Sequence, residues 1–331
     1  MRVAVTGATG FLGSWVVRHA LDAGHAVVAL GRNRARGDRL EEMGATFFPV
    51  DLHDHTGLAA ALAGVDAVIH SAALSSPWGT RAAFEQANLL GTRKVAQAAL
   101  RAGVQRLVFV SSASVYASSQ DRIGWKETDP LPLPINAYAA SKQAAEADLA
   151  QHFPADRLVV LRPRAIFGLG DAALWPRLYR AADRNAGTLP LFRGGKHPMD
   201  LLYVEDAAAA CLAALTGEPG TYNLTQGDPR PVKDVLETVF AHRGLPLRWK
   251  PVPLAPALWV ARALERWHAW RRLPGEPLIT AYGLCALAYG QTLDLRAARA
   301  GLGWTPRWNL DAALAHTFRA PSALLSQGLF A

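Results

Sequence analysis

Two residues four positions apart, Tyr138 and Lys142, could move a proton. Residues at this spacing lie on one face of a helix, one turn from each other, and the segment 137–152 has a helical pattern. A free tyrosine titrates at about pH 10, which makes it a poor acid or base at neutral pH. A nearby ammonium group favours the phenolate, so we expect Lys142 to lower the pKa of Tyr138. The pair therefore predicts proton transfer to or from a substrate oxygen.

A serine-rich segment adds a hydrogen-bonding group for the same oxygen. The residues Ser111-Ser112-Ala-Ser-Val-Tyr116 follow the apolar segment 107–111, which predicts a strand. We expect Ser112 to hold the substrate oxygen by a hydrogen bond, with Ser111 as the alternative one residue away.

The first thirteen residues predict a nucleotide-binding turn. An apolar strand over 2–5 runs into Gly7, Gly10 and Gly13 and then into a helical pattern over 12–21. Gly7 allows a sharp turn, Gly10 lets a pyrophosphate approach the backbone, and Gly13 lets the helix pack closely on the sheet. Free N–H groups at the start of the helix would face the phosphates.

A nicotinamide cofactor bound at this turn would complete the chemistry. Tyr138 would pass a proton to or from the substrate oxygen while hydride moves to or from the nicotinamide carbon, and Lys142 would also hold the nicotinamide ribose. The positively charged nicotinamide would act with Lys142 to lower the pKa of Tyr138. A Tyr-x-x-x-Lys pair alone is common on helix surfaces. Combined with the glycine turn and the serine-rich strand end, it predicts an oxidoreductase.

The end of the second predicted strand, 26–30, bears on the choice of cofactor. In a dinucleotide fold an acidic residue there binds the ribose 2′-hydroxyl. Here Gly31 is followed by Arg32, with Arg34 and Arg36 close behind. Guanidinium groups pair with a 2′-phosphate, so the sequence favours NADP(H) over NAD(H). The alternative is a solvated loop, most plausible for Arg34 and Arg36.

The third predicted strand, 46–50, ends at a second cofactor candidate. Asp51 and Leu52 follow it and are placed to contact the adenine ring. An Asp at this point can equally cap the helix predicted over 54–63.

The elements around these residues alternate regularly. Short, nearly continuous apolar strands separated by helical patterns predict an α/β fold, a Rossmann-type doubly wound parallel sheet. The predicted strands are 2–5, 26–30, 46–50, 67–70, 107–111 and 158–162, and the predicted helices are 14–23, 57–63, 82–102 and 137–152.

Beyond Arg162 the pattern becomes irregular and rich in proline. We expect a dinucleotide-binding domain over 1–165 and a smaller, mixed substrate-binding cap over 166–200 and 231–331. The segment 201–210 reads as a strand entering an alanine-rich helix, so 201–230 is expected to return to the main sheet.

Composition limits the class of protein. Of 331 residues, half are hydrophobic and only two are cysteine, and neither a signal peptide nor an apolar run long enough for a membrane span is evident. We expect a cytoplasmic protein without a disulfide scaffold or a metal site. The net charge of +8 comes mainly from scattered arginines after residue 155. Solvation, an anionic substrate or a membrane surface accounts for it as well as a nucleic acid would, and no nucleic-acid partner is expected.

Together these motifs resemble those of the extended short-chain dehydrogenases/reductases, the superfamily of NAD-dependent epimerases and dehydratases. The matching segments are Thr6 to Gly13, His70 to Ala73, Asn88 with Gly91-Thr92, Ser111 to Tyr116, Tyr138 to Lys142, Arg162-Pro163 with Phe167-Gly168, and Tyr203 to Asp206. The chain departs from the family pattern at Leu169, where a proline is usual after the glycine.

The resemblance implies roles for individual residues. Ser112, Tyr138 and Lys142 would be catalytic, and Asn88 would support a water relay to the lysine. The cofactor would contact Gly7, Thr9, Gly10, Phe11, Leu12, Gly13, Arg32, Asp51, Leu52, Ser71, Ala72, Ala73, Tyr138, Lys142, Pro163 and Ala165. The substrate would contact Trp78, Ser112 and Phe167.

Shorter motifs are similar to one branch of that superfamily, which includes 3β-hydroxysteroid dehydrogenases and 2-alkyl-3-oxoalkanoate reductases. They are Pro77-Trp78-Gly79, Gln86-Ala-Asn88, Leu161 to Gly168 and Gly275 to Thr280. The predicted function is interconversion of a secondary alcohol and a ketone on an apolar substrate, either sterol-like or a 3-oxo acid derivative. The alternatives are a nucleotide-sugar epimerase, dehydratase or reductase and, from another class, a non-catalytic dinucleotide sensor. Gly31-Arg32 disfavours an epimerase, and Ala113, where a dehydratase has Glu, disfavours a dehydratase.

The segment 254–272 fits a basic amphipathic helix, with Trp259, Arg262, Arg266, Trp270 and Arg271 in the pattern of a membrane-surface helix. We favour packing against its own domain or a dimer partner, with weak membrane contact as the alternative. The family resemblance also suggests a homodimer formed through the helices 82–102 and 137–152.

Overall fold

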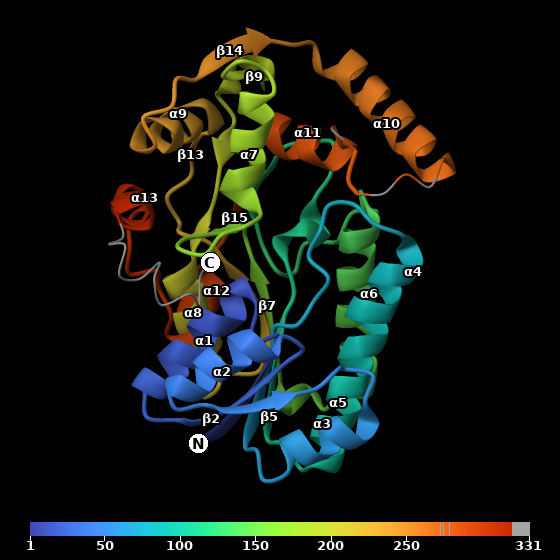
Figure 1. The fold of residues 1–331 in the computed structure, drawn as a ribbon, viewed down its shortest axis with the longest axis vertical. Coiled ribbons are helices and arrows are strands. Elements are labelled where there is room, and N and C mark those ends of the chain that lie inside the picture. Colours follow the sequence, from blue (N-terminus) through green and yellow to red (C-terminus); the bar gives the residue numbers. More distant parts are fainter. Residues whose placement is uncertain (272, 274, 278, 320–331) are drawn as a thin grey trace.

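A seven-stranded parallel sheet underlies the lower half of the molecule in Figure 1. The computed structural model describes residues 1–319 except 272, 274 and 278. The strand order is β12-β7-β5-β4-β1-β2-β3, and every neighbouring pair is parallel. The strands are β1 (Arg2–Thr6), β2 (Ala26–Gly31), β3 (Thr46–Pro49), β4 (Ala67–His70), β5 (Arg106–Val110), β7 (Leu158–Pro163) and β12 (Gly220–Leu224). The predicted doubly wound parallel sheet is confirmed.

Helices cover both faces of the sheet (Figure 1). One face packs against α1 (Phe11–Asp22), α2 (Arg34–Glu42) and α8 (Val204–Ala213), and the other against α3 (His55–Leu62), α5 (Gly91–Arg101) and α6 (Ala137–His152). With apolar layers on both sides, the central strands are buried almost completely, which explains their continuous runs of Val, Ile and Leu.

The single helix predicted over 82–102 is interrupted. It begins as α4 (Arg81–Phe84), widens into a π-helix, η1 (Glu85–Leu90), and continues as α5. A π-helical turn holds more residues than an α-turn and often occurs beside functional sites. The interruption determines which way Asn88, within η1, faces.

The expected return of the chain to the main sheet at Leu201 is wrong in position. The strand there, β11 (Leu202–Tyr203), pairs with β8 (Ile166–Phe167) in a separate two-stranded sheet. The chain rejoins the main sheet only at β12, beside β7. A strand two residues long is too short to add a row to the large sheet, so it pairs locally.

The remaining elements form a smaller, mixed region above the sheet (Figure 1). It contains the four-stranded sheet β13-β10-β15-β6 and the pair β14-β9. Its strands are β6 (Arg122–Trp125), β9 (Thr188–Leu191), β10 (Pro198–Met199), β13 (Arg230–Pro231), β14 (Arg248–Pro251) and β15 (Gln291–Leu293). Its helices are α7 (Leu174–Asp183), α9 (Val232–His242), α10 (Leu254–Trp270) and α11 (Ala281–Ala288).

The last helices are α12 (Arg296–Leu302) and α13 (Leu310–Arg319), and short 3₁₀ turns are η2 (Ala113–Tyr116), η3 (Ala155–Arg157) and η4 (Arg193–Gly195). The smaller mixed region was predicted, whereas the exact division into domains stays a prediction. Residues 320–331 of the predicted cap, Arg272 of the predicted segment 254–272 and Leu278 of the motif 275–280 lie outside the described residues. Among the described residues, none of the helices has the length and apolar character needed to cross a membrane.

Candidate active site

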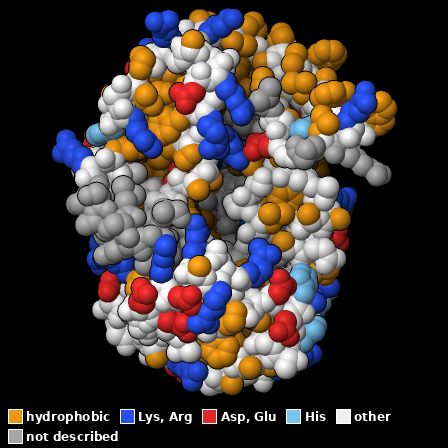
Figure 2. Space-filling view, viewed as in Figure 1, with side chains coloured by type: hydrophobic (Ala, Val, Ile, Leu, Met, Phe, Trp, Pro, Cys, Tyr) orange, Lys and Arg blue, Asp and Glu red, His pale blue; other side chains and the backbone are white. Residues whose placement is uncertain are grey.

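A cavity of about 900 Å³ opens at the carboxyl ends of the parallel strands, where α/β sheets commonly bind ligands. Figure 2 shows the surface hollowed near the middle of this face, between the two regions. Its lining includes every residue predicted to contact a cofactor, from the turn at Gly7 to Gly13 through to Tyr138, Lys142, Pro163 and Ala165. One connected space therefore brings together residues from the ends of six strands, β1, β2, β3, β4, β5 and β7.

The glycine turn has the predicted geometry. Gly7 has a φ of 69°, which L side chains rarely adopt, and the N–H of Gly10 donates to its carbonyl over 2.8 Å. A Cβ on Gly13 would lie 2.1 Å from the carbonyl oxygen of Gly7, so only glycine allows α1 to start this close to the strand. Side chains at these glycine positions would fill the space beside the turn. The open backbone therefore fits a dinucleotide.

The arginines after β2 divide between the cavity and the surface. Arg32 and Arg36 line the cavity, and Arg36 Nη1 donates to the carbonyl of Thr9 over 3.2 Å. Arg34 is absent from the lining; its guanidinium pairs with Asp38 over 2.7 Å and with Glu41 over 2.6 Å.

The possible solvated loop at Arg34 and Arg36 is instead the first turn of α2, because Asn33 caps the helix by accepting from the N–H of Arg36 over 3.0 Å. Asp51 lines the cavity and accepts from the N–H of His53 over 2.8 Å. The cap of α3 is Asp54, which accepts from the N–H of Gly57 over 3.0 Å. Capping by Asp51, the alternative raised from the sequence, is therefore wrong.

Ser111 and Ser112 face different partners. Ser112 begins the η2 turn, where its Oγ accepts from the N–H of Ser114 over 3.1 Å, and its hydroxyl lies close enough to Tyr138 to lower the pKa of that phenol. Ser111 donates to the carboxylate of Glu146 in a short hydrogen bond. Of the two, Ser112 lies at the Tyr138 hydroxyl.

Tyr138 stands in the first turn of α6, which Asn136 caps by accepting from the N–H of Ala139 over 2.8 Å. Ser112 and Ser75 lie close enough to the Tyr138 hydroxyl to act to lower its pKa. Burial has the larger effect, however, and raises the pKa of Tyr138 above its ordinary value. The lowering expected from Lys142 together with a bound nicotinamide stays a prediction, because desolvation is the largest effect in the protein by itself.

Lys142 is 2% exposed, one helical turn from Tyr138. Its Nζ donates to the carbonyl of Val110 over 2.8 Å and lies 4.7 Å from the centre of the Phe109 ring. Burial lowers its pKa to about 8, against the attraction of Glu146. The ammonium group is held beside the cavity with its charge only partly compensated.

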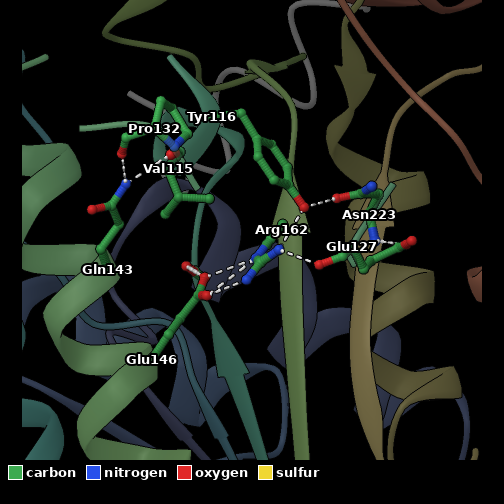
Figure 3. A network of polar contacts seen from close by, with 9 residues as sticks. Val115, Tyr116, Glu127, Pro132, Gln143, Glu146, Arg162 and Asn223 are labelled. Carbon is green, nitrogen blue, oxygen red and sulfur yellow. Dashed lines mark hydrogen bonds and ion pairs between the residues drawn. The ribbon is translucent and has the colours of Figure 1, made fainter. Parts of the chain in front are cut away.

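Behind the cavity, a buried network joins α6, β7 and β12 (Figure 3). Arg162 forms a bidentate pair with Glu146, and its Nη1 donates to the hydroxyl of Tyr116 over 2.6 Å. The Tyr116 hydroxyl donates to Asn223 over 2.8 Å, and burial raises its pKa to about 12. Tyr116 therefore stays neutral, and the network fixes α6, with Glu146 one turn beyond Lys142.

Asn88 supports the cavity wall from outside it. Its side chain accepts from the N–H of Leu74 over 2.7 Å and donates to the carbonyl of Leu74 over 3.1 Å and to Ser141 Oγ over 2.9 Å. Asn88 thus ties the segment before Ser75 to α6. The water relay expected for it stays a prediction.

Two expected substrate contacts are absent from the cavity. Phe167 is fully buried against the rings of Trp175 and Tyr203, so its assignment to the substrate is wrong; the side chain belongs to the core beside α7 and α8. Trp78 stacks on His268 of α10, with ring centres 5.7 Å apart. Its neighbour Pro77 belongs to the cavity lining, whereas Trp78 does not.

Among the lining residues missed from the sequence are Ser75, Arg164 and Tyr282. Arg164 follows Pro163 at the end of β7, and its position in Arg-Pro-Arg was a usable signal. Tyr282 comes from α11 and lies near enough to Tyr138 and Arg164 to raise the pKa of both. No local pattern connects residues so far apart in the chain.

Comparison with known proteins supports the family resemblance over most of the chain. A family model described as the NAD dependent epimerase/dehydratase family matches residues 3–225. The 2-alkyl-3-oxoalkanoate reductase of Stenotrophomonas maltophilia is 32% identical over 325 residues, 95% of this chain and 97% of that protein. The 3 beta-hydroxysteroid dehydrogenase/Delta 5-->4-isomerase of Mycobacterium tuberculosis is 29% identical and covers 95% of this chain and 88% of its own length.

A solved structure supports the fold. UDP-glucose-4-epimerase from Stenotrophomonas maltophila, with bound NAD and formylated UDP-arabinopyranose, superposes with a TM-score of 0.76 at 24% identity. The match covers 98% of this chain and 99% of that one.

Proposed function

The chain belongs to the NAD dependent epimerase/dehydratase family, and on that premise we propose that it interconverts a ketone and a secondary alcohol on an apolar substrate that carries a carboxylate. It is an NAD-dependent enzyme of the extended short-chain dehydrogenase/reductase type. The observation that carries the proposal is the cavity lining, in which Tyr138 lies beside Ser112 and Ser75 and one helical turn from the buried Lys142.

In this reaction Tyr138 exchanges a proton with the substrate oxygen. Because burial keeps its hydroxyl protonated at neutral pH, Tyr138 is suited to donate a proton to a ketone oxygen that is being reduced. Ser112 holds that oxygen by a hydrogen bond. Lys142 keeps a positive charge beside the cavity wall.

The cofactor is proposed to extend from the glycine turn to Tyr138 and Lys142. When bound, the nicotinamide supplies or accepts the hydride. Backbone N–H groups at the start of α1 would hold the pyrophosphate, and Asp51 and Leu52 would border the adenine. Arg32 and Arg36, both in the cavity lining, support a preference for NADP(H), since guanidinium groups pair with a 2′-phosphate.

The arginines provide a test of this preference. Arg32→Glu should weaken NADPH binding by about tenfold or more while leaving NADH binding unchanged or stronger. Arg34→Glu is the matched control, because Arg34 lies two residues further along the chain but is outside the cavity lining. Equal dissociation constants of native protein and Arg32→Glu for NADPH would contradict the preference.

Arg164 supports a carboxylate on the substrate. Its Nε donates a long hydrogen bond, 3.4 Å, to the carbonyl of Gln291. Burial lowers its pKa, against the weaker opposing effects of Tyr282 and Asp200. A substrate carboxylate would compensate a guanidinium that is otherwise poorly solvated. A 3-oxo acid meets this requirement, and a sterol alcohol without a carboxylate does not. The Stenotrophomonas relative is named a 2-alkyl-3-oxoalkanoate reductase, which is consistent with a 3-oxo acid as substrate.

The first experiment measures NADPH oxidation with a panel of 3-oxo acids, sterol ketones and nucleotide sugars. The expected result is turnover of 3-oxo acids that falls by about a hundredfold or more in Tyr138→Phe, with NADPH binding retained. Tyr289→Phe, outside the cavity lining, is the control. Sugar conversion without net cofactor change would establish the epimerase alternative, and cofactor binding without turnover of any panel member would favour the sensor.

A second experiment tests whether Arg164 binds a carboxylate of the substrate. Arg164→Gln should raise the KM for a 3-oxo acid by about tenfold or more and leave the KM for its methyl ester unchanged. Arg177→Gln is the control, since Arg177 also lines the cavity but pairs with Glu276 over 2.9 Å. Equal changes in KM for the acid and the ester in Arg164→Gln would refute a contact between Arg164 and a substrate carboxylate.

A further inference from the structure

The helix α10 has an apolar face that no part of the described chain covers. Trp259 is 73% exposed, Trp270 75%, Trp267 51% and Val260 44%, and Ala263 between them is also exposed. With 3.6 residues per turn these side chains fall on one continuous side of the helix. Figure 2 shows hydrophobic side chains gathered at the upper right, where Figure 1 places α10 at the outer edge of the molecule.

The opposite side of α10 attaches the helix to the protein. Leu258 and Ala261 are buried in an apolar cluster with α11, and His268 stacks on Trp78. The carboxylate of Glu265, the helix's one acidic side chain, accepts from the N–H of Ala281 over 2.8 Å. The outward tryptophans are therefore not needed to fold or attach the helix.

Arginines border the exposed apolar face. By the same helical geometry, Arg262 and Arg266 lie along one edge of it and Arg271 along the other, and all three are exposed. Arg271 also lies over the Trp270 ring, 5.1 Å from its centre. Tryptophan prefers the boundary between lipid and water, and basic residues there attract anionic headgroups.

We propose that this face of α10 docks on an anionic lipid surface. The charge pattern favours lipid over a second copy of the chain, because a two-fold contact through this face would bring the arginines of both copies together. The interaction does not depend on the reaction proposed above. The expectation that 254–272 packs against its own domain is confirmed for one side of α10, and the dimer partner given as the other possibility stays untested.

Docking would place the cavity near the membrane. Ser75, Ser76 and Pro77 line the cavity, and the next residue, Trp78, contacts His268 of α10. An apolar substrate dissolved in the lipid would therefore meet the protein at the helix adjoining the segment that forms the cavity wall.

The test is cosedimentation of the full chain with vesicles of phosphatidylcholine, with and without phosphatidylglycerol. Native protein should bind the anionic vesicles, and brominated lipid should quench its tryptophan fluorescence. Replacing Trp259, Trp267 and Trp270 with Ser should abolish this binding, and the double variant R262Q/R266Q should weaken it by about tenfold or more. Ile123→Ser, which removes an exposed hydrophobic side chain elsewhere, should bind like the native chain.

Circular dichroism and NADPH binding verify that each variant is folded. The proposal is refuted by absence of native binding to anionic vesicles, or by undiminished binding of the tryptophan variant. It is also refuted if light scattering shows that the tryptophan substitutions convert a dimer to a monomer, because the face would then be an interface between copies.

Discussion

At the scale of single residues, the adjacent Ser111 and Ser112 have different partners and different expected roles. Ser112 lies close enough to Tyr138 to lower the pKa of its hydroxyl, whereas Ser111 donates to a buried carboxylate on α6. We expect Ser112→Ala to lower kcat by about a hundredfold with little effect on stability, because a hydrogen bond to the reacting oxygen is lost. Ser111→Ala should instead lower the free energy of unfolding by about 1–2 kcal/mol and leave kcat nearly unchanged. Steady-state kinetics and urea unfolding of both variants distinguish these outcomes; the reverse pattern would transfer the role to Ser111.

Lys142 gives the reaction a pH dependence of predictable sign. Burial lowers its pKa to about 8, so its ammonium form prevails below that pH and is lost as pH rises through it. If the charge helps to hold the cofactor ribose and favours the Tyr138 phenolate, kcat/KM for the cofactor falls above about pH 8. Measurement between pH 6.5 and 9.5 tests this, with Arg164→Gln as a control that should keep the same midpoint. A flat profile would mean that the Lys142 charge has no such role.

At the scale of elements, the buried pair Glu146 and Arg162 fixes α6 against β7. Both side chains are less than 10% exposed, so removing one charge leaves the other buried without a partner. Glu146→Gln should lower the free energy of unfolding by about 3 kcal/mol. Asp148→Asn on the same helix should cost less, because its partner Arg93 is 44% exposed and can be hydrated. Equal midpoint shifts in urea would contradict this account of the pair.

At the scale of the whole molecule, the cavity is assembled from both regions. The strand ends supply the glycine turn and Ser112, and α6 supplies Tyr138, while α7 and α11 supply Arg177 and Tyr282. Substrate selectivity should therefore respond to changes far from the sheet, whereas proton transfer should depend on α6 and the end of β5.

The oligomeric state is a property of the same scale. The homodimer suggested by the family resemblance stays a prediction, with α5 and α6, which lie side by side in Figure 1, as its expected interface. Light scattering should give twice the chain mass. Leu100→Glu, at a 36% exposed side chain on α5, should give the mass of one chain, and Leu133→Glu, exposed in a loop, should not. A monomeric native chain would refute the dimer.

The sequence by itself determined the parallel sheet, the glycine turn and the pairing of Tyr138 with Lys142. These depend on local rules: alternation of strands and helices, the backbone freedom of Gly7 and the period of a helix. Even the gathering of all the expected cofactor residues around one cavity follows from them, because carboxyl ends of parallel strands share one edge.

Only the tertiary structure decided the rest. Burial, which depends on everything packed around a residue, raised the pKa of Tyr138 in the protein by itself, and it placed Phe167 in the core. Tyr282 and Arg164 meet at the cavity because distant segments pack together. Which side of α10 faces outward was likewise undetermined, because both sides are apolar and the choice depends on where α11 and Trp78 lie.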